Sequence, residues 1–149
     1  MPLYIPVFFA ALLAMLAVSR LPVLNAQNVQ AKSAQLVVGL LAYRQGINAY
    51  VYTHPELTGE IDPAQVVMPE GFVDKGLWRN YVEKGVVFIY PSPDHPSPQD
   101  AIDQAYRYAL RTPLVGTHVN GKLIGATGFD TQLSVPLVIP NGSLVIAGN

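Results

Sequence analysis

The side chains that could do chemistry are few, and their spacing assembles no reaction centre. The chain has three histidines, His54, His95 and His118, and no cysteine, which excludes disulfides, thiolate metal sites and cysteine nucleophiles. No two of these histidines have the spacing that metal ligands on one element need. His54 and His95 each precede a proline, where we expect solvated rings, and His118 is expected either on an exposed face or as a satisfied core group. We predict no metal site.

The proline-rich segment 91–98 comes nearest to a catalytic triad. Asp94 and His95 stand beside Ser92 and Ser97. A triad needs a nucleophile on a sharp elbow, oxyanion-hole donors and a base aimed at the nucleophile, whereas neighbouring residues of an extended segment point apart. We therefore predict no catalytic residue and no enzyme activity.

The acidic residues of the connection 55–75 are also dispersed. Their spacing lacks the alternate ligands, central glycine and final glutamate of an EF-hand loop. No glycine-rich phosphate loop links a predicted strand to a helix. We predict no cofactor and no small-molecule substrate. The acidic residues concerned are Glu56, Glu60, Asp62, Glu70 and Asp74.

Aromatic side chains are the remaining candidates for binding. They gather around the end of a long predicted helix and the loop after it, and most of them are expected in the core. Exposed aromatic rings contribute large contact areas to protein interfaces at a low entropic cost. From this group we select Tyr43, Tyr50 and Trp78 as candidate partner contacts.

The composition narrows the range of partners. Charged residues make up only 13% of the 149, and the formal net charge is -1. Ordinary proteins carry roughly twice that share of charge. The chain also lacks a run of lysine and arginine, which is the feature that attracts nucleic acids and anionic membrane surfaces. We therefore predict no nucleic-acid partner.

Residues 1–24 are the part of the sequence that indicates the cellular compartment of the protein. Residues 3–18 form an almost unbroken apolar run, with no charge before Arg20, and roughly 20 apolar residues span a bilayer. One interpretation is a retained membrane anchor. The other is a signal peptide cleaved before Arg20, at a small-x-small site formed by Ala17 and Ser19, or at a weaker site after Ala26. Read literally, the positive-inside rule favours a cytoplasmic body, because the positive charges follow the segment.

Residues 25–53 predict one long amphipathic helix. Apolar side chains recur at spacings of three, four and seven residues, which places them on one helical face. Asn25 can cap the start, and His54-Pro55 ends the helix because the residue before a proline is pushed out of helical space. The predicted buried stripe is Val29, Leu36, Leu40, Tyr43, Ile47 and Val51.

The remaining residues predict strands and one further helix. Residues 64–68 are expected to form a short strand, residues 78–84 are ambiguous, and residues 85–90 fit a central strand buried on both faces. A second helix is expected over residues 98–111, with a capped start and a proline, Pro113, after its end.

Two Asn-Gly pairs predict hairpins near the C-terminal end. Asn120-Gly121 separates LVGTHV from KLIGAT, and Asn141-Gly142 separates VPLVIP from SLVIAG. Asn-Gly between apolar runs is typical of a type I′ turn. The two prolines before the second pair favour an edge strand there.

These elements define an α+β fold class. It comprises an N-terminal transmembrane or signal helix, a long amphipathic helix, and a small antiparallel sheet with a second helix. The predicted domains are a membrane anchor or signal segment over residues 1–24 and a single α+β domain over residues 25–149. Within this domain the helix covers 25–53 and the sheet-containing body 64–149.

Four segments of the chain resemble the PilM family of type IVB thin-pilus proteins. They are LLAYRQGINAYV (40–51), the connection 58–72, LWRNYVEKGVVFIY (77–90) and VPLVIPNGSLVIAGN (135–149). The resemblance implies a scaffold or adaptor of the pilin transport apparatus and pilus basal body, at the bacterial inner membrane. It implies other pilus-assembly proteins as partners, contact with the membrane through the N-terminal segment, and a periplasmic domain. Self-association is left open.

Two alternatives stay open beside this resemblance. A minor pilin or pseudopilin also joins an apolar helix to an antiparallel sheet, but residues 1–24 lack the glycine and glutamate that prepilin processing requires. A cleaved signal would instead release an exported soluble binding domain into the periplasm.

Overall fold

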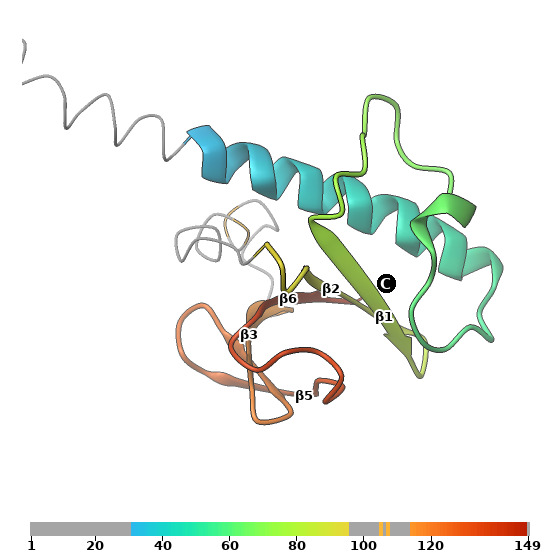
Figure 1. Ribbon diagram of the computed structural model, residues 1–149. Helices are drawn as coiled ribbons and strands as arrows, with labels where there is room; N and C mark the ends of the chain where they lie inside the picture. The colour runs from blue at the N-terminus through green and yellow to red at the C-terminus, as the bar shows by residue number, and fades with distance from the viewer. Residues whose placement is uncertain (1–30, 96–104, 106, 108–113, 149) are drawn as a thin grey trace, which may run out of the picture. The chain divides into compact units, whose positions relative to one another are not determined.

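A long helix and a six-stranded antiparallel sheet form the framework of the described residues in this computed structural model (Figure 1). The structure describes residues 31–95, 105, 107 and 114–148. The chain divides into two compact units, 1–32 and 33–149, and the fold described below is that of the second.

Some predictions fall outside the described residues. They are the anchor over 1–24, the helix start over 25–30 and most of the second helix. Of that second helix, Ala105 and Arg107 are described and both are helical; Ala105 is buried and Arg107 is exposed. Among the described residues, no helix combines the length and hydrophobicity that a bilayer crossing requires.

The long helix runs over residues 31–53 and ends where predicted, directly before His54-Pro55. Its buried side chains recur at helical spacing and pack on the sheet. One predicted position differs, because Val37 is fully buried whereas Leu36 packs only at the margin of the core. The buried stripe is Val37, Leu40, Tyr43, Ile47 and Val51.

The sheet has the strand order β1-β2-β6-β3-β4-β5, and all neighbouring pairs are antiparallel. The ambiguous stretch after residue 77 forms β1, and the predicted buried strand is β2. The Asn120-Gly121 turn is confirmed: it joins β3 to β4, and both turn residues have positive φ, 49° and 81°. The strands are β1 (Trp78–Glu83), β2 (Val86–Pro91), β3 (Val115–Val119), β4 (Lys122–Gly125), β5 (Asp130–Ser134) and β6 (Leu144–Ala147).

The second predicted hairpin is wrong. Residues 135–140 form turns, because Pro136 and Pro140 have no N–H to donate to a ladder. Their carbonyls instead accept bonds from Ile139 N and Ser143 N. Strand β6 therefore pairs with β2 and β3 in the middle of the sheet, and the edge position belongs to β5, which was not predicted.

The predicted strand over residues 64–68 is also wrong. Asp62 Oδ1 accepts a hydrogen bond from Ala64 N, and Pro63 stands at the first turn, so a 3-10 helix, η1 (Pro63–Gln65), forms there. An N-cap followed by proline favours a helical start over an extended segment.

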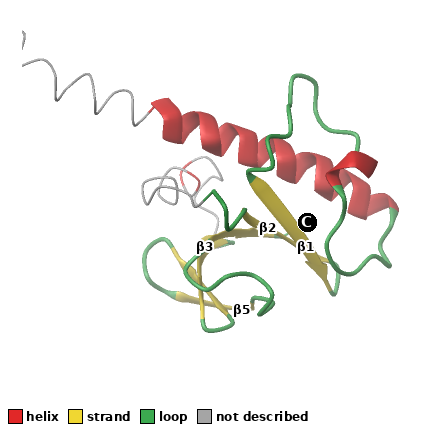
Figure 2. Cartoon of the chain, in the orientation of Figure 1, coloured by secondary structure: helices red, strands yellow, loops and turns green. Residues whose placement is uncertain are grey.

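The two faces of the sheet bury separate sets of side chains, as the two-residue period of a strand requires. Val87 and Ile89 of β2 face the long helix, whereas Phe88 and Tyr90 face the opposite side. Figure 2 shows the helix lying across one face of the sheet. On the other face, the turns over residues 135–140 bury Val135 and Ile139.

Candidate functional site

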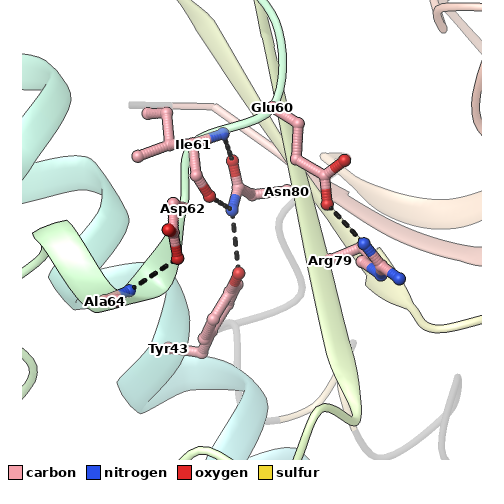
Figure 3. Close-up of polar contacts among 7 residues, drawn as sticks. All are labelled: Tyr43, Glu60, Ile61, Asp62, Ala64, Arg79 and Asn80. Atoms are coloured by element: carbon pink, nitrogen blue, oxygen red, sulfur yellow. Dashed lines mark hydrogen bonds and ion pairs between the residues drawn. The ribbon is translucent and has the colours of Figure 1, made fainter.

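The best-defined polar cluster centres on Asn80, on the side of β1 that faces the long helix (Figure 3). Asn80 is fully buried. Its Nδ2 donates to Ile61 O and to Tyr43 Oη, each at 2.8 Å, and its Oδ1 accepts from Ile61 N at 2.8 Å. The amide therefore pairs with the backbone of Ile61 as a neighbouring strand would, and it also holds the helix through Tyr43.

Tyr43 joins this cluster from the helix. Burial raises the pKa of Tyr43 to about 12, and the hydrogen bond from Asn80 opposes that rise only in part. Its ring lies 6.0 Å from the ring of Phe72, tilted by 46°, a favourable aromatic geometry. The hydroxyl is therefore neutral at physiological pH and acts as a structural hydrogen-bonding group.

The segment 59–61 covers part of the outer edge of β1. Gly59 and Val82 exchange backbone hydrogen bonds of 2.8 and 2.9 Å. Arg79 Nη1 donates to Glu60 Oε1 at 2.8 Å, and both side chains are about half exposed. Exposed pairs of this kind contribute little to stability. The covered edge is less available for pairing with another chain.

A second polar cluster, around His118, fixes the turns over residues 135–143. His118 is buried opposite Leu123, so it is a satisfied core group, one of the two predicted alternatives. Its Nε2 accepts from Gly121 N at 2.9 Å, and its Nδ1 donates to Pro140 O at 3.3 Å. Its backbone N donates to Ser143 O, and its backbone O accepts a hydrogen bond from Gly142 N. The loop is therefore held rigidly against the β3–β4 turn.

The three aromatic residues selected from the sequence occupy different environments. Tyr43 is fully buried, and Trp78 is 5% exposed and packs over Gly39 of the helix. Both rings therefore serve the core. Tyr50 is half-buried and stacks on His54, with ring centroids 4.4 Å apart. Of the three, Tyr50 keeps part of its ring at the surface.

The structure does not bring the histidines together. His54 ends the helix, His95 follows β2, and His118 is enclosed by the sheet. Within the described ranges, no group of three or more His, Asp or Glu side chains could hold a metal ion. The acidic residues singled out in the 55–75 connection are all exposed, and Glu60 forms an ion pair with Arg79.

One buried polar pair on the helix was not expected. Arg44 Nε and Asn48 Oδ1 are buried without a hydrogen-bond partner among the described residues. Burial lowers the pKa of Arg44, because desolvation disfavours the charged form. The periodicity of the sequence did not predict that these two groups are buried, since a polar residue beside an apolar stripe is normally solvated.

Taken together, the fold and its clusters define a class of protein. It is an α+β domain whose buried polar side chains, Asn80 and His118, fasten loops to a sheet. The chain belongs to the PilM family, whose model matches residues 7–147.

One solved structure shares this fold. A PilM protein from Escherichia coli B7A superposes with a TM-score of 0.60 at 20% sequence identity, over 80% of this chain and 93% of that one. A PilM protein from Pseudomonas aeruginosa 2192 gives a TM-score of 0.47 at 24% identity, over 78% and 93% of the two chains. The comparison with the E. coli protein supports the fold. No curated protein matches this chain.

Proposed function

We propose that this chain is a non-enzymatic scaffold or adaptor of type IV pilus assembly, anchored in the inner membrane by its N-terminal segment, with its α+β unit in the periplasm. The observation that carries the proposal is the PilM family match. It extends over residues 7–147 and so covers most of the apolar segment together with the α+β unit.

The way the polar side chains are used supports an adaptor. Asn80 holds segment 59–61 to β1, and His118 holds the loop after residue 135 to the β3–β4 turn. Loops fixed in this way form a binding surface that loses little conformational entropy when a partner docks. The expected partners are other pilus-assembly proteins.

Deletion of the gene tests the role. We expect cells without it to make pilin at the normal level but to assemble no pili, and the full-length gene supplied in trans to restore assembly. Immunoblots for pilin and electron microscopy of the cell surface provide the two readouts. Normal piliation in the deletion strain would remove the proposal.

The anchor and the compartment need their own test. N-terminal sequencing of the mature protein is expected to find residues 1–24 retained, whereas a start at Arg20 or Gln27 would indicate a released, soluble domain. Protease added to spheroplasts is expected to degrade the α+β unit. Protection from the protease would place the unit in the cytoplasm, as the positive-inside rule read literally suggests.

Partners can be captured from detergent-solubilised membranes with a tagged full-length chain. We expect pilus-assembly proteins to be recovered with it, and an untagged strain provides the background. Tyr50→Ala is the variant of choice for the contact surface, because its ring is half-buried and lies outside the Asn80 cluster. Recovery that is unchanged in this variant would remove Tyr50 from the interface.

A further inference from the structure

The outer face of the long helix carries a second regular pattern, distinct from the buried stripe. Six of its residues follow one another at alternating spacings of four and three, which is the heptad pattern of a coiled-coil seam. Three of them are exposed, Val38 at 57%, Tyr52 at 88% and Gln45 between them. We call this row the outer seam; its members are Ala34, Val38, Leu41, Gln45, Asn48 and Tyr52.

The outer seam lies about a third of a turn around the helix from the buried stripe, as the 3.6-residue period requires. Leu40, Tyr43 and Ile47 are fully buried against the sheet. Leu41 and Asn48, on the side of the seam nearer the core, are half-buried. A partner helix docked on the outer seam would therefore contact the long helix on a side next to the one that faces the sheet. The long helix would then be covered on two sides.

The charges around the outer seam favour a second copy of the same chain as the occupant. No member of the seam is charged, and the described part of the helix contains just two charged side chains, Lys32 and Arg44. In a parallel pair, Arg44 of one copy would face Ala49 of the other, because g positions meet the e positions of the next heptad. Along the described helix, two copies therefore bring no like charges together.

The order of the seam residues favours the parallel orientation. In a parallel pair in register, Gln45 meets its own copy, as do Asn48 and Leu41. Polar side chains matched in this way specify register in coiled coils. An antiparallel pair that overlaps the whole seam would set Val38 against Asn48 and Leu41 against Gln45, which leaves amides facing apolar side chains.

The edges of the sheet are less available than the long helix for binding a second copy of the chain. Segment 59–61 covers part of the edge of β1. Strand β5 is kinked at the other edge, because Gln132 has a φ of 63° and the β4–β5 register shifts beside it. Bulges and covered edges oppose pairing between sheets. We propose that this protein self-associates as a parallel dimer through the outer seam of its long helix.

Single-cysteine variants test this dimer directly, because the chain has no cysteine of its own. Val38→Cys, Gln45→Cys and Tyr52→Cys are made in the full-length protein, and Val67→Cys, at a valine that is 90% exposed outside the helix, is the control. After mild oxidation, we expect roughly tenfold more disulfide-linked dimer from each seam variant than from the control, because docked thiols react at a high effective concentration.

The orientation and the seam are each open to contradiction. Cross-linking that requires a mixture of Val38→Cys and Asn48→Cys chains would indicate an antiparallel pair and overturn the proposal. Equal cross-linking of the seam variants and of Val67→Cys would indicate random collision, with the same consequence. An absence of cross-linking at every seam position would also overturn the proposed dimer.

A charge placed on the seam gives an independent readout. In the Gln45→Cys background, Val38→Glu is expected to reduce disulfide dimer roughly tenfold, since two carboxylates would meet at an apolar contact. Val67→Glu in the same background is expected to have no effect. Both valines are exposed, so circular dichroism should show the same thermal midpoint for the two variants. Undiminished cross-linking with Val38→Glu would overturn the proposal, and neither experiment depends on pilus assembly.

Discussion

Asn80 makes three buried side-chain hydrogen bonds, so its substitution is expected to be costly. Asn80→Ala leaves both backbone groups of Ile61 and the hydroxyl of Tyr43 without their partner. Each buried polar group left unpaired costs about 1 to 3 kcal/mol. We expect urea unfolding to show a loss of about 3 kcal/mol or more in the free energy of unfolding.

The neighbouring residue provides the control for Asn80. Arg79→Ala removes a half-exposed ion pair, and we expect a change within about 0.5 kcal/mol in the free energy of unfolding. Equal losses from the two variants would show that the buried amide does not organise this part of the fold.

Tyr43 is expected to make stability depend on pH under alkaline conditions. Its pKa is raised to about 12 in the folded protein, against about 10 in the unfolded chain. The folded state therefore binds the proton more tightly. The stabilisation is complete below pH 10 and is lost as pH rises through 12, by about 2 to 3 kcal/mol in total.

Tyr43→Phe isolates this contribution. Below pH 10 the variant should be less stable by about 1 to 2 kcal/mol, because Asn80 Nδ2 loses its acceptor. The difference from the wild type should shrink as the pH approaches 12, since phenylalanine has no proton to lose. Urea unfolding at pH 8, 10 and 11.5 measures it, and a difference that stays constant with pH would contradict the assignment.

Replacement of Arg44 is expected to stabilise the folded protein, in contrast to replacement of Asn80 or Tyr43. Its Nε is buried without a partner among the described residues, and replacing such a group with an apolar side chain of similar length removes the cost of desolvation. Arg44→Met is expected to raise the free energy of unfolding by on the order of 1 kcal/mol. A marked loss of stability in the urea titration would reveal a favourable contact of the guanidinium.

At the scale of elements, Gly116 is a position of β3 where the paired strand β4 leaves no room for a side chain. A Cβ added there would lie 2.1 Å from Ile124 O of the paired strand, which is backbone and cannot turn aside. Gly116→Ala is therefore expected to cost about 3 kcal/mol or more, because overpacking must shift the strands. Gly125→Ala is the matched control. It meets the ring of Phe129, which is partly exposed and can rotate, so its cost in urea unfolding should be clearly smaller.

The elements that local signals specify were predictable from the sequence. His54-Pro55 ends the helix, the run after Gly85 forms a buried strand, and Asn120-Gly121 closes a hairpin. Each of these depends on residues within a few positions of one another. The place of β6 between β2 and β3 depends on partners far away in the chain, so the adjacent Asn141-Gly142 turn suggested the wrong neighbour.

The polar clusters were beyond sequence reasoning for the same reason. Asn80 bonds to residues 19 and 37 positions away, and no spacing rule connects an asparagine in a strand with a tyrosine in a helix. Tyr43 and Trp78 were selected as candidate partner contacts from their type, although helical spacing also placed Tyr43 in the predicted buried stripe, and large aromatic side chains stabilise most when buried. The His118 cluster had one usable signal, its predicted position opposite Leu123 in the hairpin.

At the scale of the whole molecule, the proposed role depends on whether residues 1–24 act as a lasting anchor or as an export address. Two chimaeras separate these roles. In the first, an unrelated cleavable signal peptide replaces residues 1–24, and the α+β unit should reach the periplasm but fail to restore pili in the deletion strain. In the second, an unrelated membrane-spanning helix replaces them, and piliation should return.

The physical reason for this expectation is effective concentration. An anchored unit stays within reach of other membrane-bound components, whereas a released one is diluted through the periplasm, and tethering can strengthen a weak interaction by roughly 10²- to 10⁴-fold. The same confinement would favour pairing through the outer seam, because two anchored copies stay at a high local concentration in one membrane. Full piliation with the cleavable chimaera would show that the segment acts in export alone and that the domain works as a diffusing component.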